Sequence, residues 1–124
     1  MLKKILAFSA VLSFRKVLTF GIALAILIEA ITVLLRFGFS LESTRDAATI
    51  GNFTLGLRVH HGYIGIFLIL LGWCFPLGLR NSLWIVGIGL LISDLMHHFI
   101  VLWYFTGSPQ FDLVYPQHPY WSRQ

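Results

Sequence analysis

Three long apolar runs dominate the pattern of hydrophobic and polar positions, and more polar stretches separate them. The runs cover residues 17–39, 57–79 and 82–105. Each is long enough to cross the hydrocarbon core of a bilayer as a helix, which takes about 20 residues. The pattern therefore predicts an all-α integral membrane protein, with three transmembrane helices in a single membrane domain that covers residues 1–124.

The remaining segments predict the connections. Only Arg80 and Asn81 separate the second run from the third, so a tight antiparallel hairpin is expected there. Residues 1–16 carry paired basic residues at both ends of a short apolar stretch, which favours an interfacial helix, or an early start of the first span, over a signal peptide. Residues 40–56 predict an extracytoplasmic loop. Residues 106–124 hold three prolines and four aromatic residues and predict an irregular tail near the lipid headgroups.

Proline and arginine are expected to modify this simple plan. Pro76 should break or kink the second helix near its inner end, because proline has no N–H to donate. Arg36 and Arg58 lie within or at the edge of apolar runs, and their guanidinium groups are expected to reach the membrane surface. Pairing with Glu42 or Asp46 is the alternative.

The composition agrees with a membrane location and excludes other classes. Hydrophobic residues make up 57% of the chain and charged residues 11%, whereas a soluble domain typically has about 25% charged residues. No cluster of basic, polar and aromatic residues indicates nucleic-acid binding. Cys74 is the only cysteine, which excludes a disulfide framework or a Cys-based zinc site within one chain.

The basic residues that flank the runs predict the orientation. Residues 1–16 and Arg80 carry a small excess of Lys and Arg over the opposite side, which places the N-terminus in the cytoplasm and the C-terminus outside. The expected location is a cell (inner) membrane. Because three helices make a small bundle, a homo-oligomer or a larger membrane complex is also expected.

Ionisable side chains within the apolar runs are the strongest indication of function. They are Glu29 in the first run, His60 and His61 in the second, and Asp94, His97 and His98 in the stretch SDLMHHFIVLW of the third. An ionisable group at the centre of a bilayer costs about 2.5–3.5 kcal/mol, so such residues are functional candidates. Helical rise and the expected hairpin place them at similar depth in the outer half of the bilayer.

Small residues share the helix faces of these ionisable groups. Gly21 and Ala25 lie on the face of Glu29, Gly65 on the face of His61, and Gly87 on the face of Asp94, all at helical spacing. Membrane helices approach closely at glycine and alanine. The ionisable groups are therefore expected at contacts between helices.

Histidine and carboxylate side chains together favour a transition-metal ion, namely Fe, Cu, Mn or Zn, because thiolate ligands are absent. Asp94 with His97 or with His98 places two ligands on one helix face. This spacing resembles the Glu-x-x-His element of carboxylate-bridged di-metal bundles. Asp-x-x-x-His inside a membrane helix is also similar to a copper site of particulate methane monooxygenases. Both resemblances cover only five residues, and they imply a ligand role for this stretch alone.

The six ionisable residues are expected to divide into ligands and supporting groups. The expected ligands are Asp94, His98 and His61. Glu29 is expected to bridge or orient them. His60 and His97 are the alternatives to their neighbours, because adjacent residues of a helix point about 100° apart.

Other interpretations of the cluster stay open in the sequence. Two histidines on antiparallel helices can be the axial ligands of a b-type haem in an electron-transfer protein. The cluster can instead fix the packing of helices in a structural subunit. A proton relay is less well supported, because the inner half of each run has no ionisable residue. The metal interpretation predicts a redox or accessory subunit of a membrane complex, and it leaves catalysis undecided.

Overall fold

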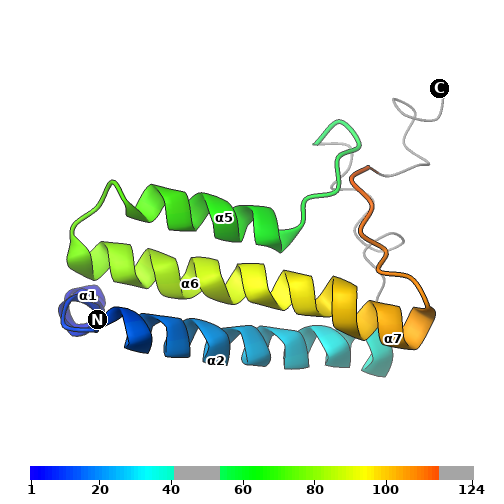
Figure 1. Ribbon diagram of the computed structural model, residues 1–124, viewed down its shortest axis with the longest axis horizontal. Coiled ribbons are helices and arrows are strands. Elements are labelled where there is room, and N and C mark those ends of the chain that lie inside the picture. Colours follow the sequence, from blue (N-terminus) through cyan, green and yellow to red (C-terminus); the bar gives the residue numbers. More distant parts are fainter. Residues whose placement is uncertain (41–53, 115–124) are drawn as a thin grey trace.

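A computed structural model describes residues 1–40 and 54–114 of the protein (Figure 1). These residues are 75% helical and include no β-strand, which confirms the all-α prediction for this part of the chain. The helices are α1 (Leu2–Ala10), α2 (Phe14–Val33) with its π-helical extension η1 (Leu34–Gly38), α5 (His61–Gly72), and α6 (Leu77–Met96), which continues through the π-helical η2 (His97–Leu102) into α7 (Trp103–Thr106).

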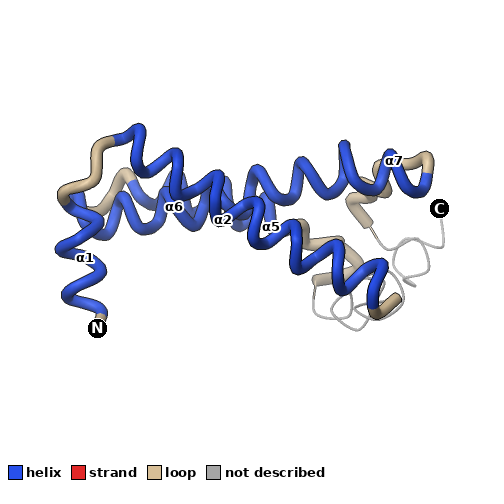
Figure 2. The backbone as a smooth tube through the Cα atoms, turned by 90° about the horizontal axis from the view of Figure 1, so that it is seen from below, coloured by secondary structure: helices blue, strands red, loops and turns tan. Residues whose placement is uncertain are grey.

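Helix α6 lies at the centre of the fold, with α2 on one side and α5 on the other (Figure 1). Helices α2 and α6 run in the same direction, and α5 runs in the opposite one. Helix α1 lies crosswise at the beginning of α6 (Figure 2). Every long helix thus packs against α6, which makes it the element that positions the others.

Glycine allows α5 and α6 to approach at backbone distance. A Cβ atom added to Gly65 would lie 2.6 Å from the carbonyl oxygen of Gly87, and one added to Gly87 would lie 2.7 Å from the carbonyl oxygen of Gly65. On the other side of α6, a Cβ atom added to Gly21 of α2 would lie 2.7 Å from the side-chain Cγ2 atom of Ile88. Close packing at small residues is the pattern expected of helices in a membrane, and it confirms the predicted contact faces.

Polar side chains join α1 to the beginning of α6. The side-chain amide of Asn81 donates to the carbonyl oxygens of Ser9 (2.8 Å) and Leu12 (3.3 Å). The hydroxyl of Ser9 donates to the carbonyl oxygen of Gly78 at 2.6 Å. Asn81 therefore adds a hydrogen-bond donor to carbonyl groups at and just beyond the end of α1 and ties that end to α6.

The turn between α5 and α6 lies earlier in the chain than predicted. Helix α5 ends at Gly72 and α6 begins at Leu77, so Arg80 and Asn81 belong to a helix and the predicted hairpin position is wrong. Pro76 occupies the position before the first residue of α6. Proline cannot continue a helix and disfavours helical geometry in the residue before it, so the expected break at Pro76 becomes a full reversal of the chain.

The second predicted span is only partly helical. Residues 57–60 precede α5 because their backbone pairs elsewhere: the N–H of Arg58 donates to the carbonyl oxygen of Leu113 at 2.9 Å, and Leu57 forms an antiparallel bridge with Val114. Helix α5 is left with 12 residues, about 18 Å long, which is shorter than the hydrocarbon core.

Two helices of the described residues are long and apolar enough to cross a membrane. They are Phe14–Gly38, with 25 residues, and Leu77–Thr106, with 30 residues. They overlap the predicted spans 17–39 and 82–105, but they begin three and five residues earlier and end within one residue of the predicted ends. The predicted interfacial segment 1–16 contains α1, whereas most of the predicted loop 40–56 and of the tail 106–124 lies outside the described residues.

The distribution of buried residues is inverted relative to a soluble protein. Only three apolar side chains of the described residues are buried, whereas nine polar or charged ones are. The buried polar residues are Ser9, Glu29, Arg58, His60, Asn81, Ser93, Asp94, His97 and His98. Large apolar side chains instead cover the outside, as Phe67 and Ile100 do with 60% of their surface exposed. Soluble monomers rarely expose apolar surface on this scale.

The glycine contact between α5 and α6 predicts the effect of adding one methyl group. Gly65→Ala should lower the free energy of unfolding in detergent by about 1–3 kcal/mol, because the new Cβ meets backbone atoms that cannot yield. Gly38→Ala is the matched control, since its nearest neighbour is the flexible end of Leu34 at 3.0 Å. Equal losses in the two variants, measured by denaturant titration, would contradict this account of the packing.

Candidate metal centre

Three elements bring His60, Asp94 and His98 together at the end of the bundle opposite α1. His60 is the residue before the first turn of α5, Asp94 lies in the last turn of α6, and His98 lies in η2. A π-helical stretch such as η2 widens the helix locally, and such stretches often occur at functional sites. All three side chains are buried, with 2–7% of their surface exposed.

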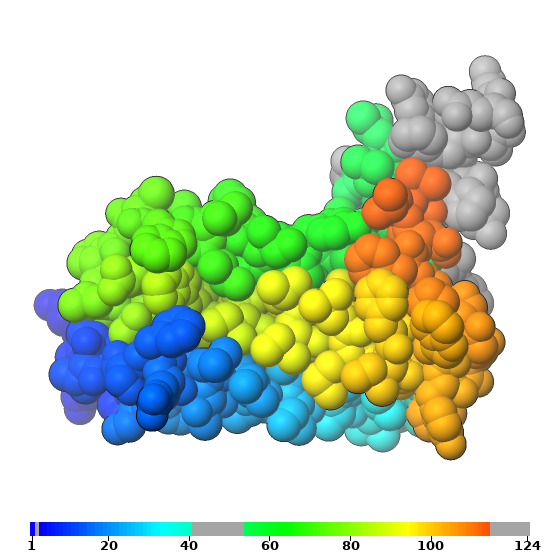
Figure 3. All heavy atoms as spheres, in the orientation of Figure 1, coloured from blue at the N-terminus to red at the C-terminus, as the bar shows by residue number. Residues whose placement is uncertain are grey.

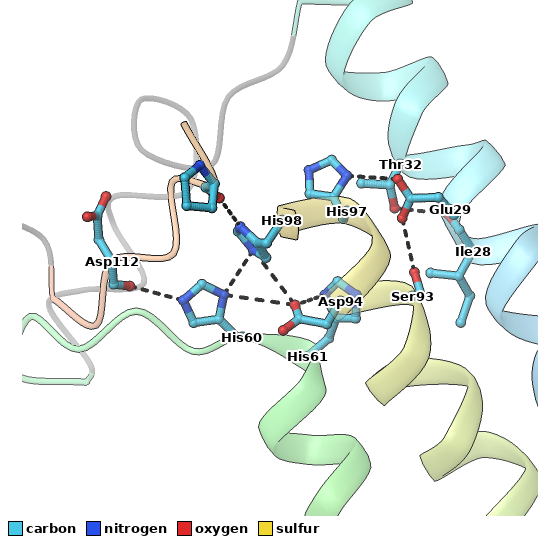
Figure 4. A network of polar contacts seen from close by, with 11 residues as sticks. Ile28, Glu29, Thr32, His60, His61, Ser93, Asp94, His97, His98 and Asp112 are labelled. Carbon is cyan, nitrogen blue, oxygen red and sulfur yellow. Dashed lines mark hydrogen bonds and ion pairs between the residues drawn. The ribbon is translucent and has the colours of Figure 1, made fainter. Parts of the chain in front are cut away.

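One atom of each residue points to a common centre (Figure 4). His60 Nδ1 lies 3.1 Å from His98 Nε2. Asp94 Oδ1 lies 3.9 Å from each of these nitrogens. Two imidazole nitrogens and one carboxylate oxygen therefore form a compact triangle of potential metal ligands.

The opposite nitrogen of each imidazole is held by a backbone carbonyl. His60 Nε2 lies 3.0 Å from the carbonyl oxygen of Asp112, and His98 Nδ1 lies 2.7 Å from that of Pro109. A carbonyl oxygen only accepts hydrogen bonds, so both of these nitrogens carry the proton and donate. In neutral imidazoles, the two nitrogens that face the centre are then left with bare lone pairs.

Two bare lone pairs at 3.1 Å repel each other unless a cation lies beside them. Asp94 Oδ1 adds negative charge to the same place and has no hydrogen-bond partner among the described residues, although it is buried. A buried polar atom without a partner costs about 1–3 kcal/mol. The centre of the triangle is therefore a site for positive charge, which a metal ion or a proton can supply.

A short segment, residues 109–114, covers this triangle, and we call it the strap. In Figure 3 the strap lies against the beginning of α5 and the end of α6. Besides the two carbonyl groups, it contributes Phe111, whose ring stacks on His60 at 4.2 Å and meets His98 edge-on at 5.1 Å. The aromatic ring thus contacts both histidines of the triangle.

Arg58 holds the strap rather than reaching the surface as predicted. Its side chain is buried, with 8% exposed, and its Nη1 donates to Asp112 Oδ2 at 3.0 Å. The alternative partners, Glu42 and Asp46, lie outside the described residues. The backbone N–H of Arg58 also pairs with the strap, at the carbonyl oxygen of Leu113, two residues before His60.

Glu29 and His97 form a separate cluster between α2 and α6. His97 Nδ1 donates to Glu29 Oε1 at 3.0 Å, and the Ser93 hydroxyl donates to Glu29 Oε2 at 3.4 Å. Figure 4 shows this group on the other side of α6 from His60. The two oxygens of Glu29 are thus engaged away from the triangle, and its expected role of bridging or orienting the ligands stays a prediction.

His61 contacts Asp94 from outside the triangle. Its Nδ1 lies 3.2 Å from Asp94 Oδ1, and 32% of its side chain is exposed. Gly62 leaves space for this arrangement, because a Cβ atom there would lie 2.7 Å from Asp94 Oδ2. The structure therefore places His60, the predicted alternative, opposite His98, and makes His61 a neighbour of the carboxylate.

No protein-family model, curated protein or solved structure matches the chain. Its function therefore has to follow from the geometry of this site.

The Glu29–His97 pair predicts a selective loss of stability. Glu29→Ala leaves the buried donors of His97 and Ser93 without an acceptor, which costs about 1–3 kcal/mol for each group. Glu29→Gln keeps an acceptor oxygen and should cost clearly less. Denaturant titration of the purified protein in detergent measures both. An alanine variant as stable as the glutamine variant would show that these bonds do not secure α2.

Proposed function

We propose that the protein binds one transition-metal ion between His60 Nδ1, His98 Nε2 and Asp94 Oδ1. The observation that carries the proposal is the hydrogen bonding of the strap. Its carbonyl oxygens accept hydrogen bonds from both outer imidazole nitrogens, so both inner lone pairs face the same buried point. Beside them lies Asp94 Oδ1, which accepts no hydrogen bond from the described residues and contacts only His61 from outside the triangle, at 3.2 Å.

The spacing of the three atoms suits an ion. Atoms 3.1, 3.9 and 3.9 Å apart lie on a circle with a radius of about 2.1 Å, close to the lengths of zinc bonds to histidine and carboxylate. An ion at the centre is thus within bonding distance of all three atoms without any movement of the chain. A shared proton between the imidazoles would satisfy only two of them.

The donor set indicates the class of ion. Two histidines and one carboxylate are the ligands of non-haem Fe(II) oxygenases and of zinc hydrolases. Three protein ligands also leave at least one coordination position for water or a small molecule, as metal ions that act on a substrate require. We therefore favour Fe(II) or Zn(II) over copper or manganese, and a reactive site over a purely structural one.

A b-type haem fits this arrangement less well. Its two axial imidazoles must lie on opposite faces of a flat ring, whereas here the two nitrogens face each other directly at 3.1 Å. Phe111 also stacks on His60, in space that a porphyrin would need. The contacts around the histidines support a single ion.

We further propose that the protein is embedded in a cell membrane through α2 and α6. The apolar outer surface and the buried polar interior support this location. The segment Leu77–Thr106, with 30 residues, is about 45 Å long, more than the hydrocarbon core of about 30 Å. If the beginning of α6 lies at one surface, Asp94 and His98 lie near the other. A cytoplasmic N-terminus and assembly into a homo-oligomer or larger complex complete the proposal.

Measurement of the metal content of the purified protein tests the site directly. Wild-type protein should carry about one equivalent of iron or zinc without the Soret band of haem. Asp94→Asn and His98→Ala should remove the ion while the helical content measured by circular dichroism is retained. Glu29→Gln is the matched control: it alters another buried carboxylate of the same bundle and should leave the metal content unchanged.

Two outcomes of the metal measurement would overturn the proposal. The first is wild-type protein that remains free of metal after expression with added iron and zinc, and that also fails to take up either ion after purification. A proton shared by His60 and His98 would then explain the geometry. The second is equal loss of metal in Glu29→Gln and Asp94→Asn, which would show that the ion depends on the bundle and not on the triangle.

The two neighbouring histidines at the start of α5 should differ in their effect. His60→Ala removes a ligand and should abolish binding of one equivalent. His61→Ala removes only a contact to the Asp94 carboxylate, so a loss of affinity of about 10–100-fold is expected, as for other residues that orient a ligand. Titration with Zn²⁺ in the presence of a competing chelator measures both. The reverse order would restore His61 as the ligand.

A further inference from the structure

The strap sets the orientation of both proposed histidine ligands, although it supplies none itself. Its contributions are the carbonyl oxygens of Pro109 and Asp112 and the ring of Phe111. If the strap moved away, each imidazole could rotate and turn an N–H toward Asp94 or toward the other histidine. The lone pairs would then no longer meet at one point, and the affinity for an ion would fall.

The strap is held in turn by the ion pair of Arg58 and Asp112. The two atoms that meet, Arg58 Nη1 and Asp112 Oδ2, are 3.0 Å apart, with the arginine buried and the aspartate 59% exposed. The backbone of Arg58 also bonds the strap at Leu113. Arg58 lies two residues before His60, so one side chain fixes both the strap and the segment that leads to a ligand.

We propose that Arg58 and Asp112 are positioning residues of the metal site, and that closure of the strap and binding of the ion are coupled. This inference rests on the proposed metal function. An ion that needs both lone pairs turned inward binds the closed strap more tightly than the open one. By linkage, the bound ion stabilises the closed strap to the same extent.

The test uses Co²⁺ as a probe, added to the full-length protein in detergent. Asp112→Asn removes the charge but keeps the size of the side chain and its backbone carbonyl. It should weaken Co²⁺ binding by about 10-fold or more, as loss of groups that orient metal ligands does. The visible absorption spectrum of bound Co²⁺ should also change, because it reports the orientation of the ligands, which a loss of stability alone does not alter.

Two further variants separate the ion pair from a general effect on the strap. Asp112→Glu keeps the charge and should restore most of the affinity and the wild-type spectrum. Gln110→Asn alters a neighbouring strap residue whose side chain donates to Thr106 at 3.3 Å, so it should bind Co²⁺ like the wild type. Hydrogen exchange of the strap amides should slow when Co²⁺ is added to the wild type, and less so in Asp112→Asn.

The possible failures are distinguishable. Wild-type protein that binds neither Co²⁺ nor the native metal would overturn the proposed function and, with it, this inference. Wild-type protein and Asp112→Asn that bind Co²⁺ equally, with the same spectrum, would overturn the coupling and leave the metal site intact. Weakening by Gln110→Asn as strong as by Asp112→Asn would show that strap stability, not the ion pair, sets the affinity.

Discussion

The hydrogen bonds from His60 and His98 to two carbonyl oxygens of the strap decide what the buried end of the bundle can bind. An imidazole that is free to rotate would turn its N–H toward a nearby carboxylate and donate a hydrogen bond to it. Here the protons are committed to the backbone, so Asp94 and two lone pairs share one small space. The rest of the bundle positions these groups. Glycine contacts bring α5 against α6, and the turn before Leu77 sets the level at which His60 meets His98.

Much of this could be predicted from the sequence, because helical period alone assigns a residue to a face. The ionisable residues and the small residues that accompany them do lie between helices, as predicted. The helical period does not indicate which neighbouring helix a given face contacts. It also gives no turn position, and the turn sets how α5 and α6 align. A hairpin centred on Arg80 and Asn81 would place His61 level with Ile100, whereas in the structure its neighbour Gly62 meets Asp94.

The strap could not have been predicted from residue types. Pro109 and Asp112 act on the histidines through backbone carbonyl groups, which every residue possesses. In the sequence, Phe111 is one more aromatic residue of an interfacial tail. The pairing of residues 57–58 with residues 113–114 joins segments more than 50 positions apart, and no local pattern indicates it. The sequence contains only one weak indication of the strap. An arginine buried at position 58 needs an anion, and Asp112 is one of few acids in the chain.

Helix α6 and its continuation η2 carry two sets of polar contacts on opposite sides of the same stretch. Ser93 and His97 face α2 and bond Glu29, whereas Asp94 and His98 face α5 and the strap. Successive residues therefore serve opposite sides of one helix, so the same short stretch joins all three long helices. The sequence predicted a single cluster of six residues because these positions are adjacent in the chain. In the structure they lie at two different helix interfaces.

The hairpin of α5 and α6 is closed by its turn at one end only, and the proposed ion lies at the other. His60 and His98 are 38 positions apart, so an ion bound to both would turn the hairpin into a closed ring of chain. In the loop-closure description used for disulfides, a link across a ring of that size removes enough freedom from the unfolded chain to contribute at most about 4 kcal/mol. Unlike a disulfide, this cross-link would need no oxidant and could be undone by a chelator. The metal would then contribute to the stability of the α5–α6 hairpin as well as to the chemistry of the protein.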